Sequence, residues 1–67
     1  MPLSARNQIK GKVTAVKRGQ AIANVEVDAD GVRLVASITA EAADELGLSE
    51  GTEVTAIIKA SDVILAT

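Results

Sequence analysis

A two-residue alternation of apolar and polar side chains, broken once by a turn, runs through the middle of this 67-residue chain. One face carries small and aliphatic residues on both sides of the turn: Ala21, Ala23, Val25 and Val27, then Val32, Leu34, Ala36 and Ile38. Such a period is typical of β-strands with one buried face. The turn Asp28-Ala29-Asp30-Gly31 is a hairpin signal, because Asp and Gly accept a positive φ. The centre of the chain is therefore predicted to be an antiparallel hairpin.

Further elements are expected on both sides of this hairpin. Residues 10–17 alternate imperfectly and are read as a strand, and 53–59 and 62–65 are read as two more. Residues 40–46 favour a short helix, with Thr39 as its N-cap and Gly47 at its C-terminal end. Three strands, one helix and two strands is the element order of an OB-type barrel. The predicted fold class is thus all-β with one short helix, a five-stranded OB-like barrel in a single domain.

The small size and plain composition limit how such a domain can be stabilised. A chain of 67 residues buries only about 60% of its unfolded surface. It contains no Cys, no His and no aromatic residue, which excludes disulfides and nearly every zinc site. Residues 54–58 and 63–66 are apolar on both faces, whereas a small barrel buries only one. A neighbouring subunit is the expected cover, so we predict a homo-oligomer.

Charge and hydropathy exclude several functions. The net charge of −2 argues against a general nucleic-acid binder, which needs a basic face. No apolar run approaches the roughly 18 residues of a membrane helix, and the N-terminus does not resemble a signal peptide. We therefore expect a soluble, cytoplasmic protein without membrane association. Catalysis is not expected, because the chain lacks the usual general bases and nucleophiles, His and Cys.

Two distant segments place a cation among small hydroxyl or amide residues. They are Ser4-Ala5-Arg6-Asn7-Gln8 and Lys59-Ala60-Ser61-Asp62. Arginine offers a planar fork of donors, lysine a point charge, and Ser or Asn neutral donors that orient oxygens. This combination suits a compact, multivalent oxyanion.

With these segments the sequence resembles the molbindin family, the small Mop domains that bind molybdate and tungstate. The Ser-small-Arg-Asn-Gln signature precedes the first strand, 36–39 (Ala-Ser-Ile-Thr) precedes the helix, and 57–61 (Ile-Ile-Lys-Ala-Ser) closes the domain. The segment 46–56 resembles the family's helix exit and turn. The resemblance spans the whole chain, so residues 1–67 are assigned as one Mop domain.

This resemblance implies a hexamer, a trimer of dimers, that binds molybdate or tungstate between subunits, with no cationic metal. A free-standing copy would store or buffer molybdate in the cytoplasm. The implied oxyanion-binding residues are Ser4, Ala5, Arg6, Asn7, Thr39, Ala42, Lys59, Ala60 and Ser61. Ala42 stands where family members often carry Ser, so its contact would come from its backbone amide or from water. A rigid site of this kind would reject sulfate because sulfate is smaller than molybdate. It would discriminate poorly between molybdate and tungstate, which are nearly the same size.

Two other classes of function remain open. An OB-fold that binds single-stranded nucleic acid needs aromatic stacking platforms and a positive groove, and the chain has neither. A purely structural oligomerisation module would tolerate Arg6→Ala without losing any ligand. Taken singly, Arg6 and Lys59 are also compatible with ordinary solvated charges, and Thr39 with a simple helix cap.

Overall fold

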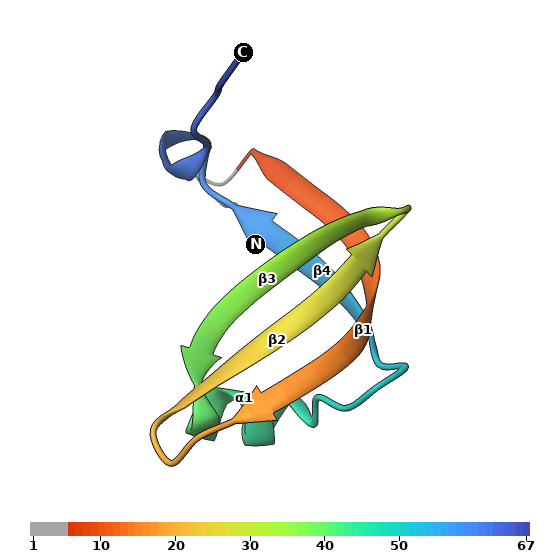
Figure 1. The fold of residues 1–67 in the computed structure, drawn as a ribbon, viewed down its shortest axis with the longest axis vertical. Helices are drawn as coiled ribbons and strands as arrows, with labels where there is room; N and C mark the ends of the chain where they lie inside the picture. Colours follow the sequence, from red (N-terminus) through yellow and green to blue (C-terminus); the bar gives the residue numbers. More distant parts are fainter. Residues whose placement is uncertain (1–5) are drawn as a thin grey trace.

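One antiparallel sheet and one short helix make up the computed structural model, which describes residues 6–67 (Figure 1). The strands pair in the order β3-β2-β1-β4. The element bounds are β1 Asn7–Arg18, β2 Ile22–Ala29, β3 Val32–Thr39, α1 Ala40–Leu46, β4 Glu53–Ile58 and the 3₁₀ turn η1 Ala60–Asp62. No helix in the described part of the chain is long and apolar enough to span a membrane.

The predicted central hairpin is confirmed. β2 and β3 pair along their whole length, and Ala29 opposite Val32 leaves a two-residue turn. Asp30 and Gly31 occupy that turn with φ of 55° and 88°, the left-handed conformation that a tight hairpin requires. The Gly31 amide also donates to Asp28 Oδ1 at 2.9 Å, which fixes the turn locally.

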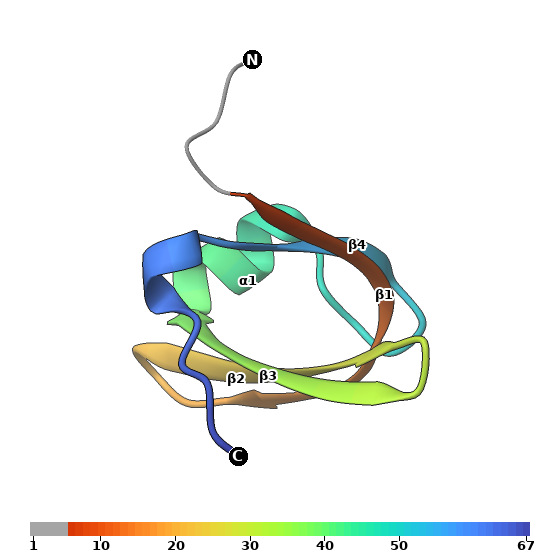
Figure 2. The same cartoon turned by 90° about the horizontal axis from the view of Figure 1, so that it is seen from above.

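β1 is longer than its sequence pattern predicted, and it belongs to both halves of the sheet. Its first half pairs with β4, from Asn7 opposite Ile58 to Lys12 opposite Glu53. Its second half pairs with β2, and the register shifts by one residue between Val13 and Ala15. This β-bulge explains why the alternation in 10–17 is imperfect, because an extra residue reverses the faces beyond it. β1 thereby curls the sheet from β4 round to β2 and β3 (Figure 2).

The helix follows the sequence prediction at both ends. Thr39 Oγ1 accepts a hydrogen bond from the Ala42 amide at 3.0 Å, as an N-cap does. Gly47 takes φ 64° at the C-cap, and its amide bonds back to the last turn. Ala40 and Ala43 face the sheet and are buried.

The predicted fifth strand at 62–65 is wrong, although the all-β, OB-like fold class is confirmed. After β4 the Asp62 amide donates to the Lys59 carbonyl at 2.9 Å and the Val63 amide to Ala60 at 3.3 Å. These bonds turn the chain before it can run back beside a strand, and a strand needs such a neighbour. The sheet therefore stays open, with β3 and β4 at its edges.

The core is small and built of aliphatic residues. Val13, Val25 and Val27 form its centre, and the half-buried side chains of Val16, Leu34, Ile38, Leu48 and Val54 pack around them. The other buried apolar residues are alanines 23, 29, 40 and 43. Several large side chains remain exposed: Ile22, Val32, Val35, Leu46, Ile57, Ile64 and Leu65. Exposed large apolar side chains of this kind favour association with another chain where they form a continuous patch.

Candidate functional site

The pairing of β1 with β4 brings the two cation-bearing segments to the same end of the sheet. The ladder ends at Asn7 opposite Ile58. Arg6 and Lys59 each stand one position beyond that last pair, although 53 positions apart in sequence. We call the residues Arg6, Asn7, Lys59, Ala60 and Ser61 the cationic end of the molecule. Ser4 and Ala5 lie outside the described residues.

The two cations of this end are not neutralised within residues 6–67. Arg6 and Lys59 are both exposed. The ion pairs within residues 6–67 join other residues, Arg18 with Asp44 and Arg33 with Glu26. The Arg18–Asp44 pair measures 2.7 Å and ties the end of β1 to α1. Two positive charges at the cationic end thus remain available to a ligand.

The neutral donors of the cationic end come from the Asn7 side chain and from the start of the turn η1. Asn7 Nδ2 donates to the Ile58 carbonyl at 3.2 Å, so this side chain fixes the first residue of β1 on the last of β4. One of its two amide hydrogens is left for a ligand. Beyond Lys59, Ala60 and Ser61 open the turn η1, and the opening amides of a helical turn have no partner within it. Together with the exposed Ser61 hydroxyl they are donors suited to an anion.

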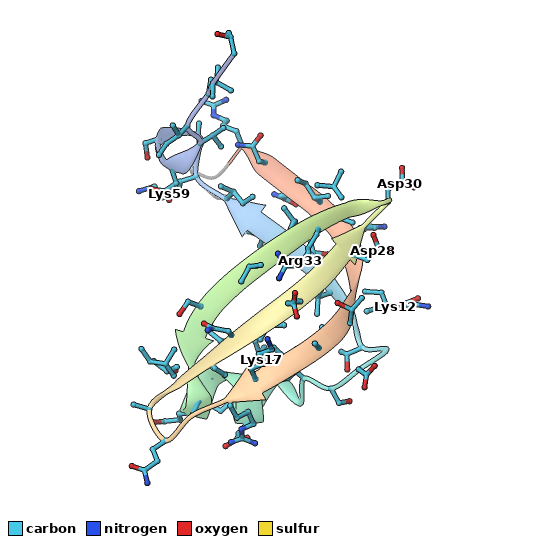
Figure 3. All side chains as sticks on the ribbon, in the orientation of Figure 1. Lys12, Lys17, Asp28, Asp30, Arg33 and Lys59 are labelled. Atoms are coloured by element: carbon cyan, nitrogen blue, oxygen red, sulfur yellow. The ribbon has the colours of Figure 1, made fainter. Side chains whose placement is uncertain are left out.

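Thr39 and Ala42 lie at the other end of the molecule. Lys59 is near the upper end of the longest axis in Figure 3, whereas α1, which Thr39 caps, is near the lower end in the same orientation in Figure 1. The Ala42 amide is already donated to Thr39 Oγ1 at 3.0 Å. The Thr39 hydroxyl hydrogen is not used by this cap, so the residue can accept from Ala42 and donate to a ligand at once.

A single protomer therefore does not bring all the predicted oxyanion ligands together. Arg6, Asn7, Lys59, Ala60 and Ser61 share one end, and the helix cap occupies the opposite one. Sequence reasoning treated Asn7 only as an anion ligand and missed that it also fixes the two strands. The strand was predicted to begin at residue 10, whereas β1 begins at Asn7, so no signal in the sequence pointed to this role.

A second, shallow groove of about 560 Å³ is less suited to an anion. It lies along β1 and the β2–β3 turn and combines Lys10 and Lys12 with the carboxylates of Asp28, Asp30 and Glu53. A dianion there would meet more acids than bases. No group of three acidic side chains that could hold a metal ion is found among residues 6–67.

Comparison with known proteins agrees with the fold and with this donor set. The sequence matches the TOBE domain over residues 3–65. The chain belongs to the TOBE domain family. It is 47% identical to molybdenum-pterin-binding protein 3 of Clostridium pasteurianum, with 97% of each chain covered. The resemblance to the molbindin, or Mop, proteins noted from the sequence motifs is thus confirmed.

Solved structures give the same result. A molybdate-binding protein from Sporomusa ovata superposes with a TM-score of 0.95 at 33% identity, and the match covers 100% of both chains. ModG, described as a cytoplasmic molybdate-binding protein and solved with molybdate bound, gives a TM-score of 0.85 at 44% identity. That match covers 90% of this chain and 43% of ModG. These relatives are described as binding proteins rather than enzymes.

Proposed function

We propose that this protein binds molybdate as a free oxyanion and stores it in the cytoplasm. One observation carries the proposal: the β1–β4 register puts Arg6 and Lys59 at one end of the sheet, and neither has a carboxylate partner in the described chain. Molybdate is a tetrahedral dianion that accepts hydrogen bonds and donates none at neutral pH. Two cations and several neutral donors match its charge and its bonding capacity.

The full ligand set requires more than one subunit. Thr39 and Ala42 are at the far end of the same protomer, so a neighbouring copy would supply their contacts to the anion. We propose that the anion lies between subunits of a homo-oligomer, a hexamer built as a trimer of dimers. The exposed apolar side chains and the small core support association. A shared site would also exclude water, which strengthens each charge-assisted bond.

Selectivity among tetrahedral dianions rests on size rather than on charge. Sulfate has shorter bonds to oxygen than molybdate, so a rigid set of donors would contact it incompletely. Tungstate is nearly the size of molybdate, and we propose that the protein binds both with similar affinity. No step of covalent chemistry is needed for this function, and we propose that the protein is not an enzyme.

Calorimetric titration of the full chain with molybdate, tungstate, sulfate and phosphate tests the proposal. We expect dissociation constants of about 1 μM or lower for the first two, roughly −8 kcal/mol, and much weaker binding of the others. Arg6→Ala and Lys59→Ala should each weaken molybdate binding by about 10- to 100-fold, because a hydrogen bond to a charged group contributes about 1.5–3 kcal/mol. Lys17→Ala is the matched control, since it removes the same charge from an exposed position elsewhere on β1.

Three outcomes would contradict parts of the proposal. Equal binding of sulfate would remove the size argument. Unchanged affinity in both Arg6→Ala and Lys59→Ala would leave only a structural oligomerisation module. A shift of single-stranded RNA or DNA in a gel at low salt, with no heat from molybdate, would favour the nucleic-acid function instead.

A further inference from the structure

The tip of the β2–β3 hairpin contains a peptide bond that can rearrange chemically. Asp30 is followed by Gly31, and no other Asp or Asn in the sequence precedes a glycine. The backbone nitrogen after an Asp can attack the side-chain carboxyl of that Asp, and glycine favours the attack because it has no side chain in the way. Both residues are exposed, and a Cβ atom at Gly31 would meet nothing within 4 Å. Water therefore reaches this peptide bond.

The rearrangement needs no reactant other than water. The Gly31 nitrogen forms a bond to Cγ of the protonated Asp30 carboxyl, and the carboxyl hydroxyl leaves with the amide proton as water. The product is a five-membered succinimide ring. Water then opens the ring. Attack at Cγ restores Asp, whereas attack at the main-chain carbonyl carbon breaks its bond to nitrogen and leaves the chain running through Cβ and Cγ. That second product, isoaspartate, has the same mass as the original chain.

The folded turn opposes closure of the ring. The φ angles of 55° at Asp30 and 88° at Gly31 match a type I′ turn, the mirror image of type I. In such a turn ψ of the first central residue is about +30°, which puts the next nitrogen about 150° from Cβ around the Cα–C bond. A five-membered ring needs these two atoms nearly eclipsed. The ring therefore closes only after that bond rotates, and the rotation opens the tip of the hairpin.

Asp28 opposes this opening. The Gly31 amide, which is the attacking group, donates to Asp28 Oδ1 at 2.9 Å, and a bond to a carboxylate is stronger than one between neutral groups. Figure 3 shows the side chains of Asp28 and Asp30 at the tip of the hairpin. The turn is also flanked by the last pair of the ladder, Ala29 with Val32, and Ala29 is buried. Opening the turn breaks the first contact and strains the second.

We propose that Asp30–Gly31 is a site of isoaspartate formation that the folded hairpin protects, with Asp28 as the residue that keeps the turn closed. Isoaspartate adds one atom to the main chain between positions 30 and 31. A two-residue turn cannot accept this atom and keep the β2–β3 register, so a modified molecule does not re-form the tip. Isoaspartate at position 30 thus indicates that the turn has opened.

Incubation of the full chain at neutral pH and physiological temperature tests the proposal. Trypsin then releases residues 19–33, and chromatography with mass spectrometry separates the isomers. A synthetic peptide of residues 28–33, too short to form the hairpin, gives the unprotected rate. We expect isoaspartate to form about 10-fold more slowly in the folded chain, because it requires local opening. Asp28→Ala should raise the rate in the full chain about 3- to 10-fold through loss of one hydrogen bond.

Two control variants separate the hydrogen bond from other effects of the change. Asp28→Asn keeps an oxygen acceptor and should stay within about twofold of the wild type. Asp62→Ala removes an exposed carboxylate from η1 and should leave the rate unchanged. Circular dichroism checks that each variant retains its sheet. A rate for Asp28→Ala equal to that of the wild type would overturn the role of Asp28. A lower rate would also overturn it, since Asp28 would then be activating the Gly31 nitrogen as a base.

A second measurement needs no change at Asp28. Asp30→Asn forms the same ring by releasing ammonia in place of water, so its products differ in mass from the starting chain and are easily counted. We expect the folded Asp30→Asn chain to react about 10-fold more slowly than the matching peptide of residues 28–33. Equal rates in chain and peptide, for this variant or for the wild type, would show that the hairpin gives no protection.

Discussion

Gly11 pairs with Val54 of β4 and directly precedes Lys12, where β1 begins to pair with β2. The backbones of β1 and β2 come very close at Gly11. A Cβ atom at this position would lie 2.6 Å from Val27 Cγ1, 2.8 Å from the Asp28 carbonyl oxygen and 3.3 Å from Ala29 Cα. Two of these atoms belong to the backbone and cannot rotate away. Gly11→Ala therefore forces the strands apart at the edge of the Val13–Val25–Val27 core.

The expected loss of stability follows from two opposing terms. Overpacking a close contact costs about 1–3 kcal/mol. Replacing Gly by Ala lowers the entropy of the unfolded chain, which offsets about 0.4–1 kcal/mol of that. The net destabilisation lies between about 0 and 2.6 kcal/mol, with a midpoint of about 1.3 kcal/mol. At that midpoint Tm falls by roughly 5–10 °C in a domain of this size. Circular dichroism is the assay, because the chain has no Trp or Tyr to fluoresce.

The matched control is Gly19→Ala. Its Cβ would meet one atom, the Ile22 carbonyl oxygen at 3.2 Å, and it makes the same change in the unfolded state. Both variants are compared with the wild type at one protein concentration, because association makes Tm depend on concentration. A Tm for Gly11→Ala equal to or above that of Gly19→Ala would refute the close approach of β1 to β2 at Gly11.

Three further changes test the helix cap and the surface. Thr39→Ala should lower the free energy of unfolding by about 0.5–2 kcal/mol through loss of the N-cap, and it should also weaken molybdate binding. Thr39→Ser should retain both the stability and the affinity. Denaturant titration measures the first effect and calorimetry the second. Ala42→Ser supplies the hydroxyl that molbindins often carry there, so calorimetry should find tighter molybdate binding with little change in the free energy of unfolding. Arg33→Ala breaks the ion pair with the half-buried Glu26, in which the Arg33 side chain is 71% exposed. It should change the free energy of unfolding by less than about 1 kcal/mol in urea, since the exposed cation is screened by solvent.

The parts of the fold that sequence reasoning predicted are those decided within a few residues. The β2–β3 hairpin depends on Asp30 and Gly31, which accept positive φ, and the helix ends depend on Thr39 and Gly47. Arg33 of β3 pairs with Glu26 of β2 across the same hairpin. In each of these cases the side chain and its backbone partner are close in sequence or share a hairpin.

The errors concern segments whose structure depends on distant partners. Residues 62–65 have the composition of a strand, yet β4 turns into η1 and leaves them without a neighbour. The bulge between Val13 and Ala15 appeared in the sequence only as an irregular alternation. Composition alone does not decide which edge a strand reaches, because several edges can bury the same apolar side chains.

The sequence by itself determined the donors of the candidate site and their local setting: the Arg and Lys segments, the capped helix and the hairpin. Tertiary structure alone decided that Asn7 pairs with Ile58, so that cations far apart in the chain share one end while Thr39 lies at the other. Turns and caps are satisfied by groups a few residues away, and their residues therefore specify them. The register of β1 on β4 depends on how the whole sheet packs, which no short stretch of sequence encodes.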